Sequence, residues 1–293
     1  MRRIIKPMMF SSIVFFTLCA SAHGPIHVRM DRVSKRIEQS PLDAALYVER
    51  ALLHQEHGEL APAEADLQRS LELKPDDPVT QTVLARVLLE KGDAPEALAL
   101  AKKILQVDPA QAGARLVEAR ALVRTGAQEP AVASFDALID QLPRPSPDLI
   151  LERSRAVLAA DPQAKARALR GLERGIAKVG LLVTLALPAI ELERELGRVD
   201  GALRKVAGLR AQSGRPTLWR VLEAEILLEA KLWGEAKQAT GRARALLDRE
   251  SCRASRANVR LLKRLVAVER ALHDRAVARK DSSISGPVPQ EVP

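Results

Sequence analysis

The chain has 293 residues, of which 47% are hydrophobic and only 2% aromatic, and its formal net charge is +9. This apolar content excludes an intrinsically disordered chain, and no run of alternating β-branched residues predicts a sheet. The only cysteines, Cys19 and Cys252, exclude a zinc ribbon and a disulfide framework.

Residues 1–22 have the features of a secretory signal peptide: a basic start, a short apolar core over 8–19 and the small-residue motif Ala20-Ser21-Ala22. We therefore expect cleavage after Ala22 and export to the bacterial periplasm. An uncleaved membrane anchor is one alternative, although the apolar run is shorter than the ~20 residues of a span. A lipoprotein attached through Cys19 is another, against which the bulky Leu18 argues. Cleavage would leave Cys252 without an internal disulfide partner.

Residues 23–43 predict an N-terminal capping helix, because a stack of helical units otherwise exposes its end. The next segment, 44–145, repeats one pattern three times. A glycine, an alanine five residues later and a proline twelve residues after that recur every 34 residues, at Gly58, Gly92 and Gly126, at Ala63, Ala97 and Ala131, and at Pro75, Pro109 and Pro143. Such a period indicates one helix-turn-helix unit stacked many times.

This pattern resembles the tetratricopeptide repeat (TPR) family. In the first unit the matching positions are Tyr47, Ala51, His54, Gly58, Ala63, Leu67 and Pro75. The resemblance implies an all-α fold, a right-handed superhelical solenoid of TPR-like hairpins. The alanine five residues after each turn glycine should lie where the two helices of a hairpin cross closely.

The period continues after a three-residue insertion near Arg144-Pro145-Ser146-Pro147, because Ala168, Ala202 and Ala236 are again 34 residues apart. Residues 146–250 therefore predict three degenerate TPR-like units. The fourth unit has Asp161-Pro162-Gln163 instead of the turn glycine, and the sixth has Lys231 at that position.

The C-terminal segment concentrates the positive charge, with thirteen Lys and Arg against four Asp and Glu between Ala236 and Lys280. Residues 251–280 predict a basic amphipathic capping helix, and residues 281–293 a disordered tail. The basic helix could contact an anionic membrane surface as a peripheral partner. It lacks interleaved aromatic residues, and export argues against nucleic acid as a partner.

No phosphate-binding loop, nucleophile elbow or metalloprotease motif occurs in the chain, so we do not expect an enzyme and assign no catalytic residue. The resemblance places the concave groove on the first helix of each unit. The charged residues at the groove positions of units two to four are Arg86, Glu90, Arg120, Arg124 and Arg153, with Asp161 at the end of unit four. They could hold an acidic or C-terminal peptide segment. Further along, the groove should become acidic, apart from Arg194, through Glu191, Glu195, Glu225 and Glu229.

Four of the five histidines, His23, His27, His54 and His57, lie close to the expected mature N-terminus. The capping helix and the first repeat helix should bring them to one edge, where neutral imidazoles could bind zinc or copper. His54 also matches a packing position of the family, and we expect no cofactor.

The sequence thus predicts a non-catalytic periplasmic scaffold or adaptor that binds a protein or peptide segment of unknown identity. Two alternatives remain open: a periplasmic metal-binding accessory protein using the histidines, and an assembly or regulatory subunit of an envelope enzyme that docks through the basic helix.

Overall fold

The structure is a computed structural model that describes residues 24–212, 214–250 and 256–284. These residues form fourteen α-helices and no β-strand, which confirms the predicted all-α class. The predicted signal peptide, His23 and Cys252 lie outside the described residues. No helix in the described part combines the length and apolar character needed to cross a membrane.

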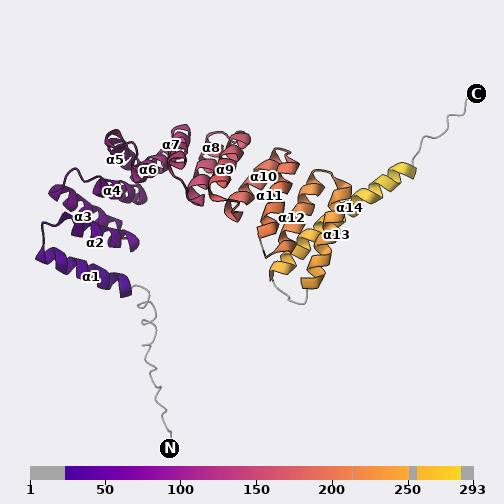
Figure 1. Ribbon diagram of the computed structural model, residues 1–293, viewed down its shortest axis with the longest axis horizontal. Coiled ribbons are helices and arrows are strands. Elements are labelled where there is room, and N and C mark those ends of the chain that lie inside the picture. Colours follow the sequence, from indigo (N-terminus) through magenta and orange to yellow (C-terminus); the bar gives the residue numbers. More distant parts are fainter. Residues whose placement is uncertain (1–23, 213, 251–255, 285–293) are drawn as a thin grey trace, which may run out of the picture. The chain divides into compact units, whose positions relative to one another are not determined.

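The chain divides into two compact units, Met1–Ala127 and Gln128–Pro293, which are described separately. The helices of the first unit are α1 (Gly24–Gln39), α2 (Ala44–Glu56), α3 (Leu60–Leu73), α4 (Pro78–Lys91), α5 (Ala94–Val107) and α6 (Ala112–Arg124). Those of the second are α7 (Gln128–Gln141), α8 (Pro147–Ala160), α9 (Lys165–Val179), α10 (Val183–Glu195), α11 (Val199–Gln212), α12 (Pro216–Glu229), α13 (Trp233–Glu250) and α14 (Arg256–Ile284) (Figure 1).

Each helix of the first unit packs against its neighbours in sequence, as the predicted hairpins require. The capping helix α1 contacts α2, the pairs α2–α3 and α4–α5 form hairpins, and α6 contacts both α4 and α5. In the second unit α7 contacts α8, and the pairs α8–α9, α10–α11 and α12–α13 form the three degenerate hairpins. Because each helix buries its apolar side only against such neighbours, the individual hairpins are stable only when stacked.

The alanines that carry the 34-residue period are all buried. All six, Ala63, Ala97, Ala131, Ala168, Ala202 and Ala236, have an exposed fraction of 0%. A small side chain at these positions lets the two backbones approach, and a larger one would force them apart. The burial that the predicted role requires is found in both regular and degenerate repeats.

The turns between the two helices of a hairpin also keep one backbone conformation from repeat to repeat. Gly58, Gly92, Gly126 and Gly197 have φ values of 82°, 106°, 82° and 68°, the left-handed region that glycine enters cheaply. Lys231, predicted at the equivalent position of the sixth unit, is the one non-glycine residue with positive φ in the described part of the chain, at 59°. The backbone of this turn is therefore conserved in shape although its residue is not glycine.

The compact units divide between α6 and α7, whereas the repeat pattern loses its regularity after residue 145. Sequence regularity records which residues occupy the turns, whereas compactness depends on packing between successive helices. The C-terminal helix continues to Ile284, so the predicted start of a disordered tail at 281 is wrong for residues 281–284. Residues 285–293 lie outside the described part.

Candidate functional site

The predicted groove residues of the first unit form a polar row across neighbouring first helices. Gln55 on α2 accepts a hydrogen bond from Arg86 on α4 at 3.0 Å, and its amide nitrogen donates to Glu90 Oε1 at 2.8 Å. Arg124 on α6 donates to the carbonyl oxygen of Leu89, and Arg120 also has an interaction partner. The structure therefore joins Arg86 and Glu90 through Gln55, and the polar groups of Arg86, Glu90 and Arg124 are engaged inside the chain.

Arg153 departs from the prediction because it is buried and does not line a groove. Its side chain is 4% exposed and forms two 3.0 Å hydrogen bonds with the carboxylate of Asp136 on α7. It also donates to the carbonyl oxygen of Arg167 at 3.2 Å. Arg153 is a buried structural cation of the second unit.

The acidic side chains expected in the later groove are each paired with a cation. Arg194 donates to Glu229 at 2.9 Å and to Glu191 at 2.8 Å. Arg264 on α14 donates to Glu225 at 2.7 Å, and this hydrogen bond is the main reason why the pKa of Arg264 is raised. Lys165 lies 3.1 Å from Glu195. These pairs neutralise much of the predicted acidic potential of this surface.

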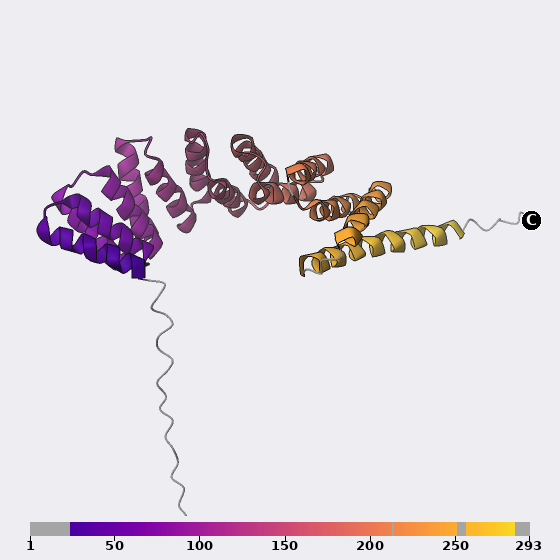
Figure 2. The ribbon, with the colours of Figure 1, turned by 60° about the horizontal axis from the view of Figure 1, so that its bottom comes forward.

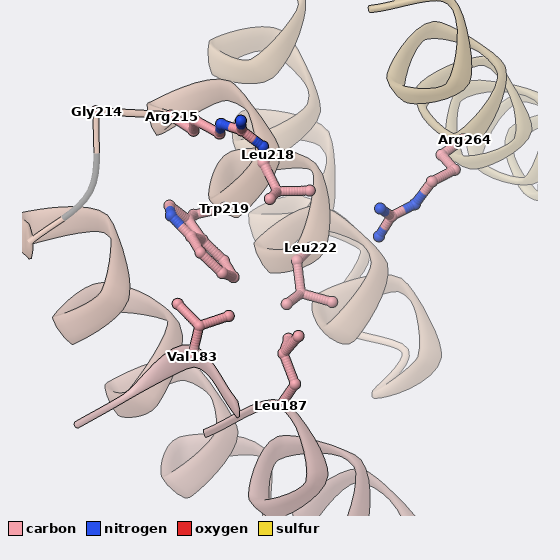
Figure 3. A pocket seen from close by; sticks show the side chains of 8 residues that line it. All are labelled: Val183, Leu187, Gly214, Arg215, Leu218, Trp219, Leu222 and Arg264. Carbon is pink, nitrogen blue, oxygen red and sulfur yellow. The ribbon is translucent and has the colours of Figure 1, made fainter. Parts of the chain in front are cut away.

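A pocket of about 620 Å³ opens beside these ion pairs, between the first helices α10 and α12 of two successive hairpins. Figure 3 shows Val183 and Leu187 from α10 facing Leu218, Trp219 and Leu222 from α12. Arg215 and Arg264 complete the lining together with Gly214. Val183 and Leu187 are 44% and 43% exposed, so this surface has the size and character to receive a large apolar side chain.

Trp219 contributes a polar atom to this apolar pocket. Its side chain is 3% exposed, and its indole nitrogen is buried without a hydrogen-bond partner. Figure 3 shows that nitrogen at the end of the ring nearest Gly214. An unpaired buried donor is costly, so an acceptor that reached this nitrogen would stabilise the pocket.

The first unit has a smaller pocket of about 510 Å³ at its own row of first helices. Its apolar lining comes from Leu42, Ala45, Val48 and Val79, of which Leu42 and Val79 are 76% and 59% exposed. Both pockets include apolar residues at positions two and five of the repeat, which the resemblance places in the groove. Only the charged residues at groove positions were predicted to bind a ligand, so these two apolar pockets were not predicted.

The histidines meet at one edge of the first unit, as predicted. The rings of His27 on α1 and His57 after α2 contact each other edge to face, with centroids 4.8 Å apart. His54 and His57 share Glu59, with Nδ1–oxygen distances of 2.6 Å and 3.0 Å. The hydrogen bond from His54, followed by that from His57, lowers the pKa of Glu59.

Within the described residues, no group of three His, Cys, Asp or Glu side chains is arranged to hold a metal ion. His23, the fourth member of the predicted set, lies outside them. Zinc or copper binding by the four histidines therefore stays the untested alternative to the expected absence of a cofactor.

Comparison with known proteins agrees with this architecture. A family model described as a tetratricopeptide repeat matches residues 88–149. The C-terminal part of a TPR repeat-containing protein from Cytophaga hutchinsonii is 11% identical, with a TM-score of 0.60 over 82% of this chain and 95% of that one.

Two further solved structures are similar to this chain. PilW, a type IV pilus biogenesis factor, is 19% identical over 64% of this chain and 86% of that one, with a TM-score of 0.54. The pilF protein of Pseudomonas aeruginosa is 15% identical over 69% and 91%, with a TM-score of 0.53. At these identities the likeness concerns the fold alone. No curated protein is similar enough in sequence to count as a match.

Residues 88–149 thus match the tetratricopeptide repeat model, and the 34-residue period and the stacked helical hairpins give the described part of the chain the fold of such repeats.

Proposed function

We propose that this protein is a non-catalytic scaffold that holds a segment of a partner protein on the first-helix faces of its hairpins. The observation that carries the proposal is the pocket between α10 and α12. There, Val183 and Leu187 remain more than 40% exposed although all four in-phase alanines of the second unit are fully buried. Apolar side chains left open beside an ordered ion-pair network are typical of a binding surface.

The size of the pocket indicates how a partner would be held. Burying one large apolar side chain contributes about 1.5–3 kcal/mol. A micromolar complex needs about 8 kcal/mol beyond the cost of immobilising the partner. One anchor is therefore insufficient, and we expect a bound segment to present two or more apolar side chains. The surrounding pairs, such as Arg264 with Glu225, would orient polar atoms of that segment.

The same reasoning makes a highly acidic ligand a poor fit. Arg86 and Arg124 donate to groups of the chain itself, and Arg153 is buried. Capture of a carboxylate would have to break these hydrogen bonds. The proposed partner segment is therefore mainly apolar, with charge playing a secondary role.

We further propose that the protein works in the bacterial periplasm. Support comes from the basic start, apolar core and cleavage motif of residues 1–22. Sequencing the N-terminus of protein purified from the envelope should give His23 as the first residue. A first residue of Met1 would contradict export by cleavage.

Selection from a displayed random-peptide library tests the binding function. We expect the mature protein to enrich peptides that contain at least two large apolar residues. Leu187→Asp and Leu218→Asp should each weaken the selected peptides by about tenfold or more, because a carboxylate replaces an apolar wall of the pocket. Val107→Asp is the matched control, since Val107 is 86% exposed on the second helix α5. Equal loss in the control, or no loss in either pocket variant, would reject the pocket as the binding surface.

A further inference from the structure

The terminal helix α14 occupies the place of the first helix of another hairpin. It packs against both α12 and α13, just as α6 packs against both α4 and α5. Leu265 and Val268 are buried in these contacts, and Arg244 of α13 pairs with Glu269 at 3.0 Å. Figures 1 and 2 show the last turns of α14 extending past the helices that it contacts. In the described part of the chain, no second helix follows to cover its outer side.

That outer side has a narrow apolar stripe. Val259, Leu262, Val266 and Val277 are 50%, 39%, 47% and 45% exposed. The first three are spaced by three and then four residues, and His273 falls in the same seven-residue register. Val277 lies eighteen residues after Val259, which is about five turns of 3.6 residues and so places it on the same side of the helix. A stripe confined to two positions per heptad is the seam by which one helix packs against another.

Uncompensated positive charge lies along this stripe. Arg260, Lys263 and Arg270 are exposed, and none of them contacts a carboxylate within the described residues. The nearby carboxylates of Glu225 and Glu269 are already bound by Arg264 and Arg244. Asp274 is an exposed carboxylate on the same helix but does not pair with these cations.

The positive charge and the narrow width of the stripe together indicate which kind of partner fits the outer face of α14. A second copy of α14 would bring like charges together along the seam, which is destabilising. A membrane surface favours a broad apolar face of Trp, Phe and Leu, whereas this stripe is narrow and contains one leucine and no aromatic Trp or Phe. We propose that the outer face of α14 docks an amphipathic helix of a partner protein whose flanking positions are acidic.

Two synthetic helices of about four heptads provide the probe. Both have leucine at the seam positions; one has glutamate and the other lysine at the flanking positions. Fluorescence anisotropy with the full mature chain should show binding of the glutamate helix only. Lys263→Glu/Arg270→Glu should weaken it by about tenfold or more and favour the lysine helix instead. Leu262→Asp/Val266→Asp should abolish binding of both helices. Circular dichroism checks that each variant remains helical.

The matched control is Lys102→Glu/Lys103→Glu, which makes the same charge change on exposed lysines of α5 and should leave binding unchanged. The proposal is overturned if the glutamate helix does not bind or is insensitive to Lys263→Glu/Arg270→Glu. It is also overturned if Val266→Asp dissociates a dimer, if anionic vesicles bind in place of the peptide, or if binding requires removal of residues 285–293. The Leu187→Asp variant, which alters the α10–α12 pocket, should bind the glutamate helix normally. If the α14 proposal fails, the proposed binding function of that pocket is therefore not affected.

Discussion

The guanidinium of Arg153 and the carboxylate of Asp136 face each other as a two-point ion pair inside the second unit, with both nitrogen–oxygen distances at 3.0 Å. Arg153 comes from α8 and Asp136 from α7, so the pair joins two successive helices. Its burial, with Arg153 at 4% exposure, makes it a structural feature and not part of a ligand surface.

Asp136→Ala should therefore destabilise the fold more than Arg153→Met. Removing the carboxylate leaves a buried cation without its partner and should cost about 3 kcal/mol. Replacing the arginine by a methionine of similar length removes the charge and keeps much of the apolar packing, so its cost should be smaller. Urea unfolding of the two variants and of the double variant measures the difference. A larger loss in Arg153→Met would show that the hydrogen bond to the Arg167 carbonyl is the dominant contact.

The misplacement of Arg153 shows where a repeat pattern stops being informative. In the regular units, glycine and proline fix the register, so the groove positions can be counted. In the fourth unit the turn glycine is missing, and the orientation of α8 depends on its neighbours. The one available signal was Gly171 within α9, where an added Cβ would lie 2.3 Å from Arg153 Nη1. A glycine inside a helix can mark the place where a large side chain of a neighbouring helix enters.

A second prediction concerns the turn at Lys231. A side chain in the left-handed region costs about 1 kcal/mol, part of which glycine loses again through unfolded-state entropy. Lys231→Gly should therefore raise the free energy of unfolding by about 0.5 kcal/mol. Gly92→Ala, at the equivalent turn with φ of 106°, should lower it by about 1 kcal/mol or more. Thermal unfolding compares the two, and stabilisation by Gly92→Ala would contradict the shared turn geometry.

Asp77, the N-cap of α4, should make stability depend on pH. Its carboxylate accepts from Lys74 at 2.7 Å and from the Thr80 backbone at 2.8 Å. The Lys74 contact first, and then Thr80, lower its pKa from 3.8 to about 2. A lowered folded-state pKa stabilises the protein above the unfolded pKa, and this contribution is lost as the pH falls toward about 2.

Asp77→Asn keeps a capping oxygen but removes the charge, and Asp77→Ala removes both. We expect Asp77→Ala to cost about 1 kcal/mol at neutral pH and Asp77→Asn to cost less. The difference between wild type and Asp77→Asn should shrink as the pH falls below about 4. Urea unfolding across this range measures it; a difference that grows on acidification would mean that the charge is not stabilising.

We expect the mature protein to bind no stoichiometric zinc or copper at the edge formed by His27, His54 and His57. Nδ1 of both His54 and His57 already pairs with Glu59, so a metal would compete with these contacts. Elemental analysis after exposure to each metal, alongside His54→Ala/His57→Ala, tests this directly. One bound metal per chain that disappears in the double variant would instead support the metal-binding accessory role.

The fold was predictable because its determinants are local and periodic. Ala63 and Ala236 lie at the same structural position although one belongs to a regular unit and the other to a degenerate one. The pockets were less predictable, because exposure depends on what the following helices leave uncovered. Leu187 is 43% exposed, whereas Val221, at the same repeat position one unit later, is fully buried in a cluster with Leu265 of α14.

Site-specific photo-crosslinking in the native cell tests the central claim that the α10–α12 pocket holds a partner segment. A benzophenone amino acid replacing Leu187 should give a discrete protein adduct that Leu218→Asp removes. The same group replacing Arg204, which is exposed on the second helix α11, should give none. An adduct that forms equally at Arg204, or that persists undiminished in Leu218→Asp, would contradict binding at this pocket.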